Sequence, residues 1–500
     1  MIKKIGMMVL AAGTLLANET DVMSAAYRAQ WNAPEVKTRI ERGIRENRMA
    51  EAAVRLPSVK PGTEVKVEQL DHAFLFGAHI FNFDQLGADD LNRKYKEMFG
   101  TLFNSATIAF YWKAFEPEPG KPRYLASEQD TAAYWNALKE PWKEFHWRRP
   151  SPEKIIEFCE SKGLAMHGHP LIWGNTGWNH PSWVSKDPDK REEMERLFEK
   201  RVREICGYYK GRIPSWDIVN ESVDPVPGKP RYGVMPEDYT FKVFKWAEEG
   251  FPASVRFNIN DSWRGVYPPF IRDLIARGAK IDVVGLQMHL FGSQPVLDLA
   301  AGKKINHNNT SWAPADVIRY LEELDTLGRP IHLSEITIPA PGEDARANAM
   351  QAELTRDMYR LWFSWPSIYR ITWWNTVDDC GARGEPLKSG IFTRQMEPKP
   401  VFHTLNGLIN GEWKTRLTAK PDAEGRVTFR GFKGRYRLSY TDDAGTAKSV
   451  TFNLLKDGDG LLEKHLQNPL PTGVARASCP CFMGGTPMPR RVLQEPRKEG

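Results

Sequence analysis

Two glutamates, Glu221 and Glu335, stand where apolar runs give way to polar side chains. Glu221 closes the stretch SWDIVNE, residues 215–221, and Glu335 lies within PIHLSEITI, residues 330–338. An acid is seldom fully buried without a partner, so a lone acid at the end of a strand is usually exposed. Two carboxylates that flank one site are instead what cleavage of a glycosidic bond requires, one as a protonated acid and one ionised. The pair is therefore the candidate catalytic pair, provided that the fold brings both together.

Eight apolar runs have the length and composition of buried strands. They cover residues 74–80, 104–110, 164–173, 215–221, 255–262, 282–290, 330–338 and 369–378. Segments with helical periodicity, such as residues 191–209 and 314–328, lie between them. This alternation predicts an α/β fold, a (β/α)8 TIM barrel, with a doubly wound open sheet as the alternative.

Polar side chains gather in the later part or just past the end of these predicted strands. In a TIM barrel the chemistry lies at the carboxyl ends of the strands, whereas surface residues would be scattered. Asn220, beside Glu221, would hold a sugar hydroxyl or, alternatively, only cap the strand. The clustered residues are His169, Asn220, Glu221, Asp261, Gln287, His289, Glu335 and Asp378.

The motifs at these strand ends resemble glycoside hydrolase family 10, the endo-1,4-β-xylanases, over roughly residues 65–410. GHPLIWG is similar to that family's Gly-His-Thr-Leu-Val-Trp-His, SWDIVNE to its Trp-Asp-Val-Val-Asn-Glu, and HLSEITI to its Ile-Thr-Glu-Leu-Asp strand. QMHL, TWWNTVD and KPVF also align. Each motif is weak alone, but their order along eight predicted strands is specific.

The resemblance implies a retaining endo-1,4-β-xylanase that acts on xylan or a related β-glycan and needs no cofactor or metal. It implies that Glu221 is the acid/base and Glu335 the nucleophile, with carboxyl groups about 5 to 5.5 Å apart. It further implies that Asn220 bonds the 2-hydroxyl of the sugar and that His289 bonds the nucleophile. The other substrate contacts that it implies are Lys113, His169, Trp173, Gln287 and Trp374.

Several positions depart from the family pattern. After the second predicted strand the sequence reads TIAFYWKAFEPEPG, without the Glu-Asn pair that grips the next sugar. Phe110, Tyr111 and Trp112 in this stretch predict a more apolar wall or, equally, side chains that pack the strand–helix junction. The departures at single positions, where the family has His, Asp and Gly, are Gly174, Thr337 and Asn375.

Other functional classes remain open at this stage. His167 and His169, with Asp217, Asp261 and His289, could be ligands of a metal-dependent barrel hydrolase. A family 10-like β-glycosidase on another β-glycan and a non-catalytic carbohydrate-binding barrel are further alternatives. Nucleic-acid binding is not expected, because 69 basic and 63 acidic residues leave a net charge of only +6, without a long basic run.

The flanks of the barrel have their own patterns. Residues 1–25 resemble a secretory signal peptide, which predicts a secreted or periplasmic protein without a membrane span in its mature form. Residues 26–72 predict a helix and a β-element, residues 73–411 the barrel, and residues 412–465 a small β-rich element. Residues 466–500, rich in Pro and Gly, predict disorder. The five cysteines form no framework, and we expect a monomer.

Overall fold

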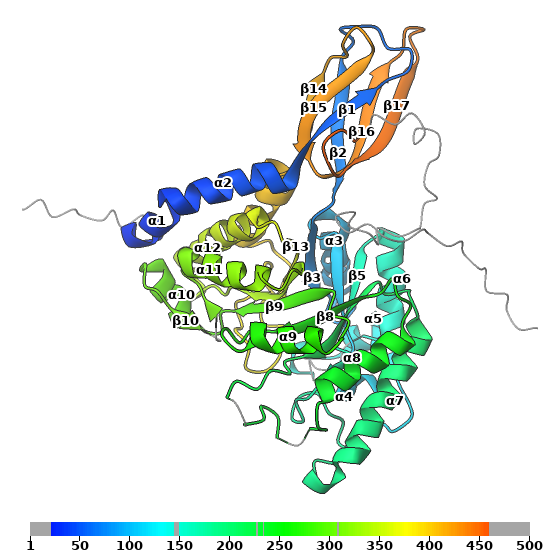
Figure 1. Ribbon diagram of the computed structural model, residues 1–500, viewed down its shortest axis with the longest axis vertical. Coiled ribbons are helices and arrows are strands. Elements are labelled where there is room, and N and C mark those ends of the chain that lie inside the picture. Colours follow the sequence, from blue (N-terminus) through cyan, green and yellow to red (C-terminus); the bar gives the residue numbers. More distant parts are fainter. Residues whose placement is uncertain (1–21, 145–149, 227–228, 234, 308–309, 460–500) are drawn as a thin grey trace, which may run out of the picture.

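The computed structural model describes residues 22–144, 150–226, 229–233, 235–307 and 310–459 (Figure 1). The predicted disordered tail, and nearly all of the predicted signal peptide, lie outside these residues. Within them, two bodies stand one above the other in Figure 1: a large barrel and a smaller group of strands at one end.

The large body is a closed barrel of eight parallel strands, as the alternating sequence pattern predicts. β3 pairs with both β4 and β13, which closes the ring, and the two-residue β6 continues the third barrel strand after β5. Each element lies inside or within one residue of its predicted run. The strands are β3 (Leu75–His79), β4 (Ser105–Ala109), β5 (Ala165–His169), β6 (Ile172–Trp173), β7 (Ser215–Asn220), β8 (Arg256–Asp261), β9 (Val283–His289), β12 (Ile331–Thr337) and β13 (Ile368–Trp373).

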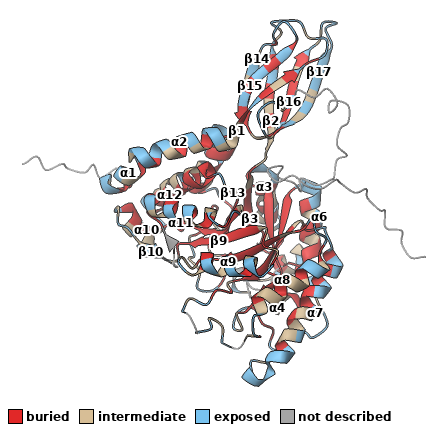
Figure 2. Ribbon diagram, in the orientation of Figure 1, coloured by how far each residue is buried: buried red, intermediate tan, exposed pale blue. Residues whose placement is uncertain are grey.

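Helices surround this barrel, and Figure 2 shows buried strands inside helices whose outer faces are exposed. In α11, for example, the apolar residues Val317, Leu321 and Leu324 are buried on one face, at the spacing of an amphipathic helix. The longer helices of the barrel are α3 (Asp89–Thr101), α6 (Pro152–Lys162), α7 (Arg191–Tyr209), α8 (Tyr239–Gly250), α9 (Tyr267–Ala276), α10 (Ser293–Ala300), α11 (Pro314–Asp325) and α12 (Ala345–Ser364).

The smaller body, here called the β-module, combines strands from both ends of the chain. One sheet pairs β1 (Met49–Arg55) with β15 (Arg426–Phe432). The other has the order β14 (Arg416–Ala419), β2 (Val65–His72), β16 (Gly434–Thr441) and β17 (Ala447–Leu454). The β-module has its own apolar core, which includes Val54, Val67, Val427, Leu438 and Leu454. The chain enters it from α1 (Ala25–Trp31) and α2 (Pro34–Arg48), and α2 packs against α12.

No helix within the described residues is both apolar enough and long enough to span a lipid bilayer.

Candidate active site

Glu221 is the residue that directly follows β7, at the carboxyl end of the barrel. Its backbone has φ of 53°, a left-handed conformation that costs a residue with a side chain on the order of 1 kcal/mol or more. The conformation is held because the N–H of Glu221 donates to the carbonyl of Asn260 on β8, at 2.7 Å. Strain of this kind is concentrated at functional sites, where it turns a side chain in a direction that a regular strand would not give.

Glu335 reaches the same end of the barrel from β12. The register of β12 shifts against β9 between Leu333 and Glu335, and an irregularity in this part of the strand also occurs against β13. Such bulges re-aim side chains next to active sites. As a result, the consecutive residues Ser334 and Glu335 both contact Asn260 of β8.

The carboxylate of Glu335 is held by three donors. Asn260 Nδ2 lies 2.6 Å from Oε1, Gln287 Nε2 lies 3.0 Å from the same oxygen, and His289 Nε2 lies 3.0 Å from Oε2. The Glu335 side chain is almost completely buried, so these bonds replace the water that it has lost. They fix the direction in which the carboxylate points.

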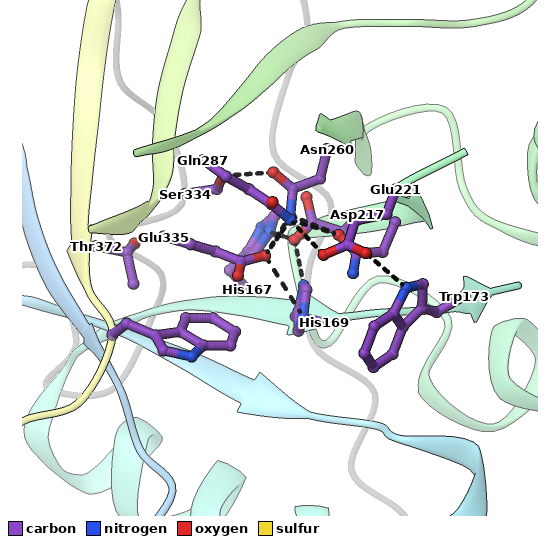
Figure 3. Close-up of polar contacts among 12 residues, drawn as sticks. His167, His169, Trp173, Asp217, Glu221, Asn260, Gln287, Ser334, Glu335 and Thr372 are labelled. Atoms are coloured by element: carbon purple, nitrogen blue, oxygen red, sulfur yellow. Dashed lines mark hydrogen bonds and ion pairs between the residues drawn. The ribbon is translucent and has the colours of Figure 1, made fainter. Parts of the chain in front are cut away.

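Gln287 connects the two glutamates (Figure 3). Its Nε2 lies 3.3 Å from Oε1 of Glu221 and 3.0 Å from Oε1 of Glu335. Asn220 joins the same group, because its Oδ1 accepts from Asn260 at 2.8 Å and from Gln287 at 3.2 Å. The glutamates from the fourth and seventh barrel strands therefore share one site.

His289 is oriented from behind by Thr337. The two ring nitrogens have separate partners, with Nδ1 2.8 Å from Oγ1 of Thr337 and Nε2 3.0 Å from Glu335. A threonine hydroxyl that donates to Nδ1 leaves the proton of a neutral imidazole on Nε2, where it faces the carboxylate. Thr337 thus occupies the place of the family's aspartate and still orients the histidine.

His169 lies below the glutamates on β5 and is bound to a buried acid. Its Nδ1 is 2.7 Å from Oδ2 of Asp217, and His167 Nε2 is 3.0 Å from the same oxygen. Burial lowers the pKa of His169, but the bond to Asp217 and the nearby negative charge of Glu335 outweigh it and raise the pKa. For the carboxyl of Asp217, burial acts in the other direction and raises the pKa. The two histidines outweigh this effect and hold the pKa of Asp217 well below its ordinary value. A protonated His169 would face Glu335, with Nε2 3.9 Å from Oε1.

Two further partners of Glu221, Arg231 and Tyr232, lie on the loop after β7 and were missed by the sequence reasoning. Arg231 Nη2 lies 3.0 Å from Oε2 of Glu221, and Arg231 Nη1 lies 3.0 Å from Oδ1 of Asp261. Tyr232 also donates its hydroxyl to Oε2 of Glu221, and Trp173 Nε1 lies 3.1 Å from that oxygen. The sequence offered no signal for Arg231 or Tyr232, because neither lies on a predicted strand end.

These contacts change the protonation of both acids. Burial raises the pKa of Glu221, but the charge of Arg231 and the hydrogen bond from Tyr232 lower it below the ordinary value. Burial raises the pKa of Asp261 to about 6, against the lowering effect of Arg231. Arg231 therefore favours the ionised form of Glu221.

The family comparison covers most of the barrel. Residues 74–407 match the family model described as glycosyl hydrolase family 10, which is more than half of the chain. The chain belongs to glycosyl hydrolase family 10.

Relatives of this family 10 chain are distant. An endo-1,4-beta-xylanase B from Thermotoga neapolitana is 26% identical over 281 residues, which are 53% of this chain and 75% of that one. A thermostable celloxylanase from Thermoclostridium stercorarium is 30% identical over 295 residues, 52% of this chain and 72% of that one. The anti-sigma-I factor RsgI6 of Acetivibrio thermocellus is 27% identical over 311 residues, 62% of this chain, and the match spans only 37% of the factor's length.

The fold of family 10 is also found by structure. Xylanase 10B from Thermotoga petrophila, solved in complex with xylobiose, superimposes with a TM-score of 0.52 at 22% identity, covering 68% of this chain and 95% of the other. Native xylanase 10B from Thermotoga maritima superimposes with a TM-score of 0.51 at 23% identity, and the match covers 68% of this chain and 96% of the other. The share of this chain left unmatched is about what the β-module and the two ends contribute.

Gly174 explains how the loop of this family 10 chain reaches its acid. A Cβ atom at position 174 would lie 3.0 Å from Sδ of Met235 and 3.2 Å from Cδ2 of Tyr232. Both distances are tighter than most side chains allow. The replacement of the family's histidine by glycine therefore leaves the space in which Tyr232 approaches Glu221.

The aromatic run after β4 divides between the site and the core. Tyr111 packs beside the site, with its ring centroid 5.6 Å from that of His169 and 6.0 Å from that of Trp173. Phe110 points away and packs on Trp216 at 4.6 Å, and Trp112 is likewise buried in the main core. Of the two interpretations of this run, the apolar wall therefore holds for Tyr111, and packing at the strand–helix junction holds for Phe110 and Trp112.

Trp374 completes this wall from the end of β13. Its ring meets those of Phe81 and His169 edge to face, at centroid distances of 4.9 and 5.4 Å. Its Nε1 is 3.1 Å from Oε1 of Glu385, whose other oxygen accepts from Asn375 at 2.6 Å. Asn375, another departure from family 10, thus helps to fix the loop that supports the tryptophan.

Three other residues named from the sequence, Lys113, Asp378 and Asp261, remain to be placed. Lys113 lies just past β4, in the short helix α4 (Trp112–Phe115), and its side chain is half-buried. Asp378 is not part of the catalytic group, because it forms a buried ion pair with Lys399 at 3.0 Å. Asp261 is paired with Arg231.

The metal-ligand alternative has no support in the described part of the chain. There, no three or more His, Cys, Asp or Glu side chains are grouped as a metal site would require. Of the residues that the sequence suggested as metal ligands, His167 and His169 contact Asp217, and His289 contacts Thr337.

Proposed function

We propose that this protein is a retaining endo-1,4-β-xylanase in which Glu221 is the acid/base and Glu335 the nucleophile. The observation that carries the proposal is the position of Gln287 Nε2, which is 3.3 Å from one glutamate and 3.0 Å from the other. The two oxygens cannot be further apart than the sum of these lengths. This bound applies to one oxygen of each carboxylate, and it is compatible with the roughly 5 to 5.5 Å between the carboxyl groups of retaining glycosidases.

The surroundings of Glu335 suit a nucleophile. Its carboxylate is oriented by donors from two neighbouring strands, β8 and β9, and His289 and Asn260 leave little freedom for it to turn away from a sugar in the site. A nucleophile held in the attacking direction lowers the entropy that must be lost in the transition state. In this proposal Glu335 attacks the anomeric carbon and forms a covalent glycosyl-enzyme.

The surroundings of Glu221 suit a group that alternates between acid and base. Protonated Glu221 gives its proton to the leaving oxygen, and the resulting carboxylate is stabilised by Arg231 and Tyr232. The same carboxylate then takes a proton from the water that hydrolyses the intermediate. Because Arg231 favours the ionised form, the first step needs a lower pH than it would without the arginine.

Asn220 and the aromatic rings would bind the sugar. Nδ2 of Asn220 donates to no described residue, whereas its Oδ1 is already engaged, so the amide N–H groups are available to a sugar hydroxyl. Tyr111 and Trp374, which lie in one buried apolar cluster, would supply the aromatic faces for a sugar ring.

The choice of xylan rests on the names of the curated relatives, two of which are a xylanase and a celloxylanase. A related β-glycan is the second candidate, and the observation that favours it is Tyr111, which adds an apolar surface to a chain that lacks the polar Glu-Asn pair. Hydrolysis of xylan, mixed-linkage glucan and cellulose should be compared by reducing-sugar release and product chromatography. We expect xylan to be cleaved fastest, into several oligosaccharides. Faster hydrolysis of a glucan than of xylan would show that the substrate is a glucan. Release of only one short product would show that the enzyme is not endo-acting.

We also propose that the protein is secreted or periplasmic and acts as a monomer. The support is the pair of lysines and the apolar run at residues 1–17. Mass spectrometry of the N-terminus of protein collected outside the cytoplasm would show whether a leader is removed.

A further inference from the structure

A cavity lies between the β-module and the barrel, at the opposite end of the barrel strands from the glutamates. Its volume is about 400 Å³, within the roughly 300 to 1,000 Å³ of small-molecule sites. Residues at the amino ends of barrel strands line one side, among them Phe74, Arg256 and Tyr369. Phe432 and Lys433 of the β-module line the other.

The charges around this cavity are unequal. Its lining includes Arg48, Arg256, Arg329 and Lys433, against one acidic residue, Asp325. The carboxylate of Asp325 already accepts hydrogen bonds from two neighbouring side chains, Trp365 and Ser367. The field inside the cavity is therefore positive.

Two of the four basic groups already have partners in the barrel. Arg48 donates to three backbone carbonyls, including that of Ile368 at 2.6 Å, and so fixes α2 to the loop before β13. Arg329 Nε donates to the carbonyl of Ile281 at 2.7 Å. These two arginines have a structural task.

The side chains of the other two basic residues, Arg256 and Lys433, have no hydrogen-bond or ion-pair partner within the described residues. The guanidinium of Arg256 lies 5.8 Å from the centroid of the Tyr369 ring but makes no hydrogen bond or ion pair there. The side chain of Lys433 likewise has neither, although its backbone N–H donates to Arg48. Both side chains are half-buried. Half-buried cations without an anion have lost hydration that nothing in the protein replaces.

Aromatic side chains form part of the remaining wall. The rings of Phe74 and Phe363 lie 5.0 Å apart, and Phe363 is 6.2 Å from Phe432. Aromatic faces bind the apolar face of another ring, either a sugar or an arene. A mere packing gap between two bodies would need only apolar walls and paired charges.

We propose that this cavity is a binding site for a small molecule that carries one carboxylate on a ring. Arg256 and Lys433 bind the carboxylate, and the aromatic residues bind the ring. Acidic sugars and aromatic acids share this chemistry. The inference does not rest on the proposed function, because the cavity shares no residue with the candidate active site.

Isothermal titration of the full chain tests the proposal with sodium glucuronate in one arm and sodium benzoate in the other. Glucose and benzamide serve as the neutral analogues. We expect at least one carboxylate to bind about tenfold or more tightly than its neutral analogue, because a charge-assisted hydrogen bond contributes that much. Binding of glucuronate alone would assign an acidic sugar, and binding of benzoate alone an aromatic acid.

Variants locate the binding. Arg256→Gln and Lys433→Gln, alone and together, should each weaken it about tenfold or more, while Lys448→Gln on exposed β17 should not. Circular dichroism and hydrolytic activity should stay unchanged in all variants, and either single variant suffices if the double variant does not fold. The proposal is overturned if neither carboxylate binds more tightly than its neutral analogue, or if both single variants bind as the wild type does.

Discussion

Arg231 forms an ion pair with Glu221, with 3.0 Å between Nη2 and Oε2. The same guanidinium binds Asp261 with its other terminal nitrogen, also at 3.0 Å. One arginine thus serves two carboxylates, of which one is the candidate acid/base. The arrangement ties the protonation of Glu221 to a loop outside the barrel strands.

The pH dependence of activity should reveal this ion pair. The first chemical step needs protonated Glu221, and because its pKa is lowered, this form is lost at a lower pH than for an ordinary glutamate. Tyr232→Phe removes one donor to Oε2 and should move the alkaline limb of kcat/KM to higher pH, and Arg231→Gln should move it further. The exposed Arg203→Gln is the control and should leave the limb in place. An unchanged limb in both active-site variants would contradict the assignment of Glu221 as the acid.

The stability of the fold should also depend on the ionisation of Glu221, and this dependence should appear at acid pH. A carboxyl with a lowered folded pKa stabilises the protein above its unfolded pKa, and this contribution is lost as pH falls through the folded value. We therefore expect Arg231→Gln to lower the thermal unfolding midpoint more at neutral pH than at an acid pH at which Glu221 is protonated in the folded protein. Differential scanning calorimetry at both pH values measures this difference, and an equal loss at both would show that the ion pair does not stabilise the fold.

Removal of each glutamate should have a different effect. Glu221→Ala should lower xylan hydrolysis by about 10² to 10⁴-fold, yet spare the glycosylation step on a dinitrophenyl xylobioside, whose leaving group needs no proton. Glu335→Ala should lose both activities, because no covalent intermediate can form. Burst and steady-state kinetics of both variants on both substrates decide the matter. The roles would have to be exchanged if Glu335→Ala retained the activated substrate.

The first product should keep the β configuration. Two inversions at the anomeric carbon, one by Glu335 and one by water, restore the original stereochemistry. Proton NMR of a fresh digest reports the anomer before it equilibrates. An α-anomer at early times would mean that water attacks directly and that Glu335 is not the nucleophile.

Thr337→Val should lower kcat about tenfold, because His289 would lose the hydroxyl that orients it toward Glu335. The matched control is Thr372→Val on the next strand, where the threonine bonds His332 at the same distance, 2.8 Å, but does not contact either glutamate. Both variants should lose similar stability. Equal kcat in the two variants would show that the hydroxyl of Thr337 is only structural.

Gly174→Ala should displace Tyr232, because a Cβ atom would lie 3.2 Å from its ring. The alkaline limb should then move as it does in Tyr232→Phe. Gly177→Ala is the control, since its Cβ would meet only Oδ1 of Asn175 at an ordinary 3.5 Å. If Gly174→Ala left the limb unchanged while the fold stayed intact, the glycine would not be what admits the loop.

The order of the barrel strands and the convergence of the two glutamates at one end of the barrel could be inferred from the sequence. Strands of a parallel barrel all end at one face, so a polar residue that follows an apolar run is placed by the chain itself. This is why Glu221, Gln287, His289 and Glu335 could be found without coordinates, although they lie on different strands. Local periodicity was sufficient because each of these positions depends on its own strand.

Other parts of the site depended on contacts between segments that are distant in sequence. The consecutive residues Phe110 and Tyr111 face the core and the site, respectively, because the strand ends at Ala109 and the chain turns there into α4. The approach of Tyr232 to Glu221 depends on the empty space at Gly174, which follows another strand, β6. Periodicity describes only neighbours along one element, whereas the packing of loops is fixed by volumes and charges that meet only in the folded chain. The sequence therefore determined which residues end the strands, and the tertiary structure decided which loop residues lie against them.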